Sequence, residues 1–126
     1  TYFQAPSGLP LIQHSLQMML DFYHQGEISF ERIVEKMCHA PADLFTIKER
    51  GYLREGYFAD LVLVDLNKDY TVTKNNIAYK CGWSPIENHT FKASVNKTFV
   101  NGNIVYDSGN IIESVKGARL MFDLRS

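Results

Sequence analysis

The sequence has few of the features that mark specialised protein classes. Its 126 residues include only two cysteines, far apart and not in the CxxC spacing of many metal sites. Basic and acidic residues nearly balance, at 13 against 14, so there is no excess of positive charge for binding nucleic acid. No apolar run approaches the length that spans a membrane. We therefore expect a cytoplasmic protein with reduced thiols, no nucleic-acid partner and no membrane association.

The composition is that of an ordinary folded domain. Hydrophobic residues make up 45% of the chain and charged residues 21%, which is enough for one modest domain with a core. There are no internal repeats and no low-complexity segments. Helical patterns occupy the first part of the chain and short strand patterns the second, so the expected fold class is α+β.

The stretch at residues 38–65 organises the rest. Pro41 suits the first turn of a helix, and Gly51 is a candidate for the residue that stops that helix. Gly56 bends the chain again before a strand at Leu61–Asp65. Four of these strand residues are consecutive and apolar, a pattern that predicts a central strand covered on both faces.

Before this stretch the sequence predicts a loop and two helices. Prolines and a glycine mark residues 5–10 as a loop. Apolar residues cover most of the circumference of the helix expected at 11–23, so this helix should be largely buried. Gly26 should end it, and Ser29 is a plausible N-cap for a second helix at 30–37.

After this stretch the pattern changes to short strands and turns. Weak alternation marks residues 70–73, and a second strand is expected at 92–100. The segment 81–85, with its glycine, proline and lone tryptophan, is expected to be an ordered loop that packs against a large surface. Asn101-Gly102 lies between two apolar runs, which favours a β-hairpin with a type I′ turn.

The motifs of residues 38–65 resemble the amidohydrolase superfamily. A helix with a Pro-Ala pair leads there through a Gly-x-Leu-x-x-Gly turn to an Ala-Asp-Leu strand that ends in aspartate. The matching residues are Pro41, Ala42, Gly51, Leu53, Gly56, Ala59, Asp60, Leu61 and Asp65. In that superfamily the segment joins a metal-dependent (β/α)8 barrel to a small β-sandwich. The resemblance implies that residues 1–50 are the closing helices of the barrel and that residues 51–126 are part of the sandwich.

Other motifs narrow the resemblance to the dihydroorotases, among the cyclic amidohydrolases. These motifs are Ala5-Pro6-Ser7-Gly8-Leu9-Pro10, His39-Ala40-Pro41-Ala42, Gly82-Trp83-Ser84-Pro85 and Phe99-Val100-Asn101-Gly102. Together they resemble the C-terminal part of that family. Allantoinases and hydantoinases share the segment that joins barrel and sandwich, so they are the alternative within the group.

This resemblance implies a zinc hydrolase that interconverts dihydroorotate and N-carbamoyl-L-aspartate in pyrimidine biosynthesis. In such an enzyme zinc generates hydroxide at neutral pH and polarises the ring carbonyl. An aspartate after the eighth barrel strand moves the proton to the leaving nitrogen. These groups meet at the C-terminal face of the barrel.

None of the family's metal ligands or its catalytic aspartate has a counterpart in this chain, so no catalytic residue and no metal ligand is assigned. His39 beside Cys38 lacks the spacing of a ligand pair, and Cys81 with His89 is equally weak. His14 is assigned to helix packing, or to a hydrogen-bonded or surface position, because no second ligand shares its helical face. We expect the chain alone to be inactive and free of zinc.

One element of the substrate site is expected within this chain. In dihydroorotases the loop after the catalytic aspartate contacts the substrate through its backbone, and the matching residues are Ser7 and Gly8. Glycine allows a ligand to approach the main chain closely. A residue chosen for turn geometry alone is the alternative for this position.

The chain is therefore expected to be a fragment, with its catalytic groups upstream of Thr1. The sheet should then present an unpaired edge or borrow a strand from a neighbouring copy, and the first helix should expose apolar surface or pack against another copy. A complete, non-enzymatic α+β binding module is the alternative from another functional class.

Overall fold

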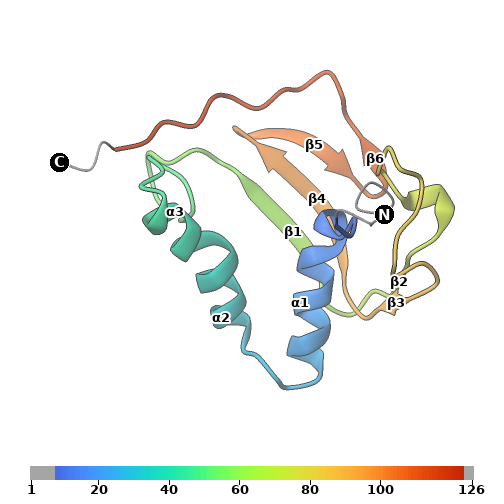
Figure 1. Ribbon diagram of the computed structural model, residues 1–126. Helices are drawn as coiled ribbons and strands as arrows, with labels where there is room; N and C mark the ends of the chain where they lie inside the picture. Colours follow the sequence, from blue (N-terminus) through green and yellow to red (C-terminus); the bar gives the residue numbers. More distant parts are fainter. Residues whose placement is uncertain (1–7, 124–126) are drawn as a thin grey trace, which may run out of the picture.

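The computed structural model describes residues 8–123 (Figure 1). Its helical elements are η2 (Ile12–His14), α1 (Ser15–His24), α2 (Phe30–Val34), η3 (Glu35–His39), α3 (Ala40–Leu44) and η4 (Lys74–Asn76). Its strands are β1 (Leu61–Asp65), β2 (Tyr70–Thr71), β3 (Thr90–Phe91), β4 (Ser94–Val100), β5 (Asn103–Asp107) and β6 (Asn110–Ile111). None of the helices in this part of the chain is long and apolar enough to cross a membrane.

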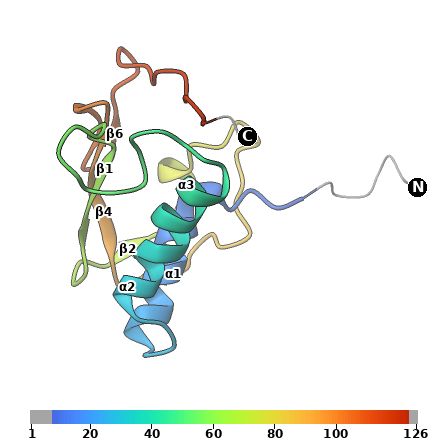
Figure 2. The ribbon, with the colours of Figure 1, turned by 90° about the vertical axis from the view of Figure 1, so that its left-hand side faces the viewer.

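The strands form two antiparallel sheets beside a layer of helices. The larger sheet has the order β1-β4-β5-β6, and the smaller one pairs β2 with β3. Figure 2 shows the helices together on one side of the larger sheet. Leu20 of α1, Ile33 of α2 and Ala93 are buried at the centre of a small core, with Val64 and Leu66 packed against them. The α+β class is thus confirmed, and the strands expected at 61–65, at 92–100 and after the Asn101-Gly102 turn lie side by side in the larger sheet as β1, β4 and β5.

The local signals around the first turn between helices act as expected. Gly26, with φ of +78°, is the left-handed residue after α1. Its N–H bonds to the Tyr23 carbonyl, and the Glu27 N–H bonds to the Phe22 carbonyl, the pair of bonds that defines a Schellman motif. The Ser29 hydroxyl accepts the Arg32 N–H at 3.2 Å, so Ser29 is the N-cap of α2.

Pro41 lies in the first turn of α3, as its sequence predicts, but it does not start a new helix. The elements α2, η3 and α3 follow one another without a break from Phe30 to Leu44, and Pro41 lies inside this run. Proline removes a backbone donor and its ring crowds the carbonyl four residues earlier. The turn before it is a π-helix, in which the Ala40 N–H reaches back five residues to the Glu35 carbonyl. This wider turn is the local geometry in which the helix continues through the proline.

Gly51 does not stop this helix either. Thr46 does, with φ of +52°, and bonds from Thr46 to Asp43 and from Ile47 to Ala42 complete another Schellman motif. Gly51, with φ of +81°, instead lies against the side of the helix. A Cβ at this position would be 2.3 Å from the Ala42 Cβ and 2.8 Å from the Cys38 oxygen. The glycine is needed for close packing, which its place in the sequence does not reveal.

β1 has the predicted bounds but not the predicted position. It pairs only with β4 among the described strands, so it is an edge strand rather than a central one. Val62 and Leu63 remain 47% and 49% exposed. The apolar residues of β1 therefore form a surface that no part of residues 8–123 covers completely. The unpaired edge expected for the sheet is confirmed, and β1 itself provides it.

The β4–β5 hairpin confirms the type I′ prediction and is locked to the start of β1. Asn101 and Gly102 have φ of +50° and +79°, as this turn requires. The Asn101 N–H donates to Asp60 Oδ1 at 2.8 Å, and Asp60 forms an ion pair with Arg50. Arg50 also donates to Asn101 Oδ1 and lies 4.2 Å over the Phe58 ring. We call this set of contacts among Arg50, Phe58, Asp60 and Asn101 the Arg50–Asp60 lock.

The first helix is less buried than its sequence predicts. Leu20 is fully buried, but Phe22 is 39% exposed and Ile12, in the turn before α1, is 85% exposed. This agrees with the expectation that the helix shows apolar surface. Trp83 is also 44% exposed, so the predicted packing of its loop against a large surface is not found within the described residues.

Candidate functional site: the loop before the first helix

The loop assigned to substrate contact leads directly into η2. Ser7 lies outside the described residues, and Gly8 is exposed. No described atom comes within 4 Å of the position that a Cβ on Gly8 would take. Packing within the described part of the chain therefore does not require glycine here. Among residues 8–123, nothing fills the space beside this backbone.

Gln13 anchors the end of this loop to a segment more than sixty residues away. Its side-chain Nε2 donates to the Asn76 carbonyl at 2.7 Å, and its Oε1 accepts the Ala78 N–H at 2.8 Å. Its backbone N–H donates to the Tyr79 hydroxyl at 2.8 Å. The amide thus pairs with one acceptor and one donor of the backbone, as a neighbouring strand would. Three bonds fix η2, in which the loop ends.

His14 sits beside this anchor in a box of aromatic rings. Phe91 stacks on its imidazole at 6.0 Å, and the rings of Tyr70 and Tyr79 lie at 6.0 and 6.2 Å. The side chain is fully buried, and neither ring nitrogen has a hydrogen-bond partner among the described residues. Burial lowers the pKa of His14, because the charged form loses its hydration. Its assignment to packing is confirmed, whereas a hydrogen-bonded or surface position is not what the structure shows.

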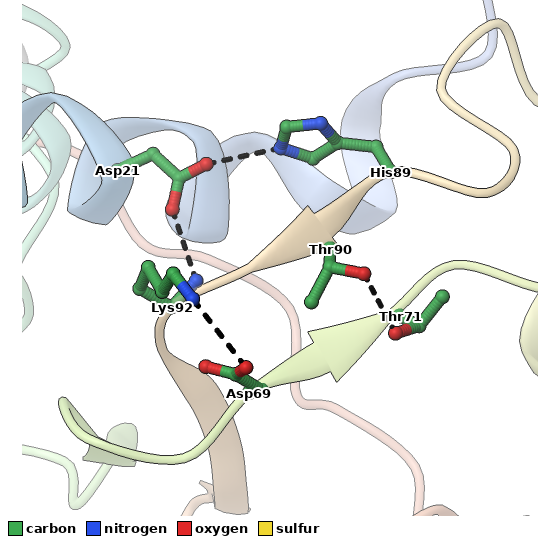
Figure 3. A network of polar contacts seen from close by, with 6 residues as sticks. All are labelled: Asp21, Asp69, Thr71, His89, Thr90 and Lys92. Carbon is green, nitrogen blue, oxygen red and sulfur yellow. Dashed lines mark hydrogen bonds and ion pairs between the residues drawn. The ribbon is translucent and has the colours of Figure 1, made fainter.

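A second tether holds α1 toward its other end (Figure 3). Asp21 Oδ1 accepts the backbone N–H of Lys92 at 3.1 Å, and Asp21 Oδ2 lies 3.0 Å from His89 Nε2. Lys92 also reaches Asp69 at 3.5 Å. Asp21 joins α1 to the β2–β3 sheet just as Gln13 joins η2 to residues 76–79. The two tethers flank the same helix, and only Gln13 adjoins the loop.

The histidines and cysteines do not gather into a metal site within residues 8–123. No group of three or more histidine, cysteine, aspartate or glutamate side chains there could hold a metal. His39 stacks on Tyr52 at 4.2 Å, with the rings nearly parallel. Cys38 faces an apolar cavity of about 480 Å³, where burial raises the pKa of its thiol. The residues described here therefore do not fit the zinc cage implied by the resemblance.

The same cavity shows where the helices and the edge strand leave apolar surface open. It is lined by α2 and η3 on one side and by β1 on the other, with Leu53 and Phe58 at its margin. Leu53 is 87% exposed. This groove is continuous with the unpaired edge of β1, so one occupant could cover both.

Comparison with known proteins defines the class to which these features belong. The model of the amidohydrolase family matches residues 8–105. The chain therefore belongs to the amidohydrolase family. Among solved structures, an L-hydantoinase from Arthrobacter aurescens superposes with a TM-score of 0.80 at 32% identity, over 88% of this chain and 25% of that one.

Within the family the chain is similar to dihydroorotases, as its motifs predicted. It is 35% identical over 115 residues to a dihydroorotase of Pyrococcus horikoshii, covering 91% of this chain and 27% of that protein. It is also 32% identical over 120 residues to an allantoinase of Desulfitobacterium hafniense, covering 94% of this chain and 27% of that protein. The chain spans about a quarter of the length of these curated relatives.

Gln13 is the functional candidate that the sequence motifs did not reveal. It lies at a helix start, where a polar residue is ordinary. Its partners are separated from it by 63 to 66 residues. The tyrosines around His14 are equally remote. Only the folded chain brings these residues together next to the Gly8 loop.

Proposed function

We propose that this chain is the C-terminal part of a dihydroorotase, a zinc hydrolase that interconverts dihydroorotate and N-carbamoyl-L-aspartate in de novo pyrimidine biosynthesis. The observation that carries this proposal is the similarity to dihydroorotases over 91% of the chain. In this proposal residues 1–50 are the last helices of the barrel and residues 51–126 are part of the sandwich. The enzyme would be cytoplasmic.

The zinc and the catalytic aspartate would come from residues outside this chain. The side chains of residues 8–123 offer no cage for a metal, so the 126-residue polypeptide alone should be inactive and zinc-free. This chain would contribute the substrate loop, with Ser7 and Gly8 presenting backbone groups to the ring. The free space beside Gly8 supports this role, since a bound substrate could occupy it.

A hydantoinase or allantoinase activity is the second candidate. The superposition on the L-hydantoinase and the similarity to the allantoinase favour it. All three activities open a cyclic amide, and the segment shared among them does not contain the metal ligands expected from the resemblance. A non-enzymatic binding module would show none of these activities.

The test is an assay of the complete polypeptide that contains this segment. We expect hydrolysis of dihydroorotate, with hydantoin and allantoin turned over far more slowly. Gly8→Ala should reduce kcat/KM for dihydroorotate by about tenfold or more, because a methyl group would crowd the substrate at a backbone contact. Hydantoin or allantoin as the preferred substrate would replace the proposal with the second candidate, and no turnover of any cyclic amide would favour the module.

A further proposal concerns the partner of the exposed groove. We propose that the isolated chain associates with a second copy through β1, because its edge and the neighbouring apolar groove are both open. Sedimentation velocity over a range of concentrations measures this directly.

A further inference from the structure

We propose that Gln13 is a positioning residue for the substrate loop, which it fixes against residues 76–79. The inference rests on the proposed function and adds to it a residue that does not itself contact the substrate. The end of the loop at η2 is held by three hydrogen bonds from this one residue, at 2.7 and 2.8 Å.

The chemistry of the contact requires an amide. Nε2 faces a carbonyl and Oε1 faces an N–H, so donor and acceptor must both be present on one planar group. Glutamate has nearly the same shape, but it has no donor for Asn76 and places a negative charge near that carbonyl. Alanine removes both bonds. The Gln13 side chain thus hydrogen-bonds to two backbone groups, the Asn76 carbonyl and the Ala78 N–H, at the same time.

The position of Gln13 ties this contact to the loop rather than to the helix alone. The His14 N–H bonds to the Leu11 carbonyl at 3.1 Å, so the turn that contains Gln13 also closes the loop. Next to it, His14 is buried among rings from the same part of the fold. In Figure 2 the blue start of the helix lies beside the yellow-green turn at residues 74–76. Movement of this turn would move Gly8, five residues before Gln13.

Asp21 provides a matched control in α1, which directly follows η2. It too makes two side-chain bonds to a remote segment, to Lys92 and His89, but toward the other end of α1. Loss of either tether should destabilise the packing of α1. Only the loss of Gln13 should loosen the loop. The two variants therefore separate positioning from general stability.

The experiment compares Gln13→Ala, Gln13→Glu and Asp21→Ala in the complete polypeptide, and it measures steady-state hydrolysis of the cyclic amide that the wild type prefers. We expect both Gln13 variants to raise KM by about tenfold. Gln13→Ala loses two hydrogen bonds of ordinary net strength, whereas Gln13→Glu keeps an acceptor for Ala78 but places a charged oxygen against the Asn76 carbonyl. kcat should change by less than about threefold, the pattern for lost binding without lost chemistry. Asp21→Ala, which removes both bonds of that tether, should leave KM within about twofold of the wild type at a comparable loss of thermal stability.

Hydrogen exchange on the same proteins provides a second readout. Amides of residues 9–13 should exchange about tenfold faster in both Gln13 variants than in Asp21→Ala, with proline excluded. Two outcomes with an active wild type would refute the positioning role alone. Either the Gln13 variants keep the KM and the loop exchange of the wild type, or they change in the same way as Asp21→Ala. A wild type that hydrolyses no cyclic amide would instead refute the proposed function, and the inference with it.

Discussion

The Arg50–Asp60 lock offers a quantitative test of how the sheet is held to the helices. Asp60 accepts the Asn101 N–H through Oδ1 and pairs with Arg50 through Oδ2. Asp60→Ala removes both contacts at once. Arg50, whose side chain is only 10% exposed, is then left without its counter-ion.

The cost can be worked out from these two contacts. A hydrogen bond to a charged acceptor contributes about 1.5 kcal/mol. A surface ion pair contributes roughly 0–1 kcal/mol to stability, and breaking a buried pair costs about 3–5 kcal/mol. The loss from the Arg50–Asp60 pair should fall between these values, because the Asp60 side chain is 33% exposed. Arg50 keeps its bond to Asn101 and its contact with the Phe58 ring. We expect Asp60→Ala to lower the free energy of unfolding by about 2–3 kcal/mol, or roughly 8–12 °C in Tm.

Urea unfolding followed by far-ultraviolet circular dichroism measures this loss. Measurements at several protein concentrations separate it from any self-association. Asp69→Ala is the control, because Asp69 pairs with Lys92 at 3.5 Å while both side chains are 60% exposed or more. That change should cost less than about 0.5 kcal/mol. Equal losses for the two variants would refute the argument that burial makes the Arg50–Asp60 lock strong.

Three further predictions test other parts of the fold. Gly51→Ala should destabilise the chain by about 3 kcal/mol or more, against about 1 kcal/mol for Gly26→Ala. Both glycines have positive φ, but only a Cβ at Gly51 would clash with the helix. Equal losses in denaturant titrations would contradict this. Because burial lowers the pKa of His14, the unfolded chain takes up the proton first, so stability should fall as the pH drops below about 6.5. His14→Phe should reduce this slope by up to about 1.4 kcal/mol per pH unit, and an unchanged slope in melts between pH 7.5 and 5 would exclude His14 as its source. Leu63→Lys, at the exposed edge of β1, should shift sedimentation toward the monomer, and association that persists would locate the contact elsewhere.

Much of the local structure could be predicted from the sequence because its causes lie within a few residues. Gly26 and Ser29 end one helix and begin the next through bonds to residues three to five positions away. The Asn101-Gly102 turn needs only two residues that tolerate positive φ, and β1 has the bounds that its apolar run indicated. Membership of the amidohydrolase family could also be predicted from the sequence, since the motifs of the family are short and local.

The remaining features depend on partners far away in the chain. Leu61–Asp65 has the pattern of a central strand because four of its residues are apolar. The order of the strands in the sheet nevertheless places it at an edge, where no described strand pairs with its free side. Gly51 has the sequence pattern of a helix stop. In the structure, the Ala42 Cβ lies 2.3 Å from the position that a Cβ on residue 51 would take, so close packing requires the glycine.

The candidate site divides in the same way. The sequence by itself predicts Ser7 and Gly8 as substrate-contact residues, because they match a family motif, and this stays a prediction. Only the tertiary structure decided that Gln13 bonds to residues 76–79 and that His14 is buried beside it, since hydrogen-bond and ring partners 56 to 77 residues away leave no periodic or local trace in the chain. Side-chain chemistry sets what each residue can bond to, and the folded backbone sets which partner it meets.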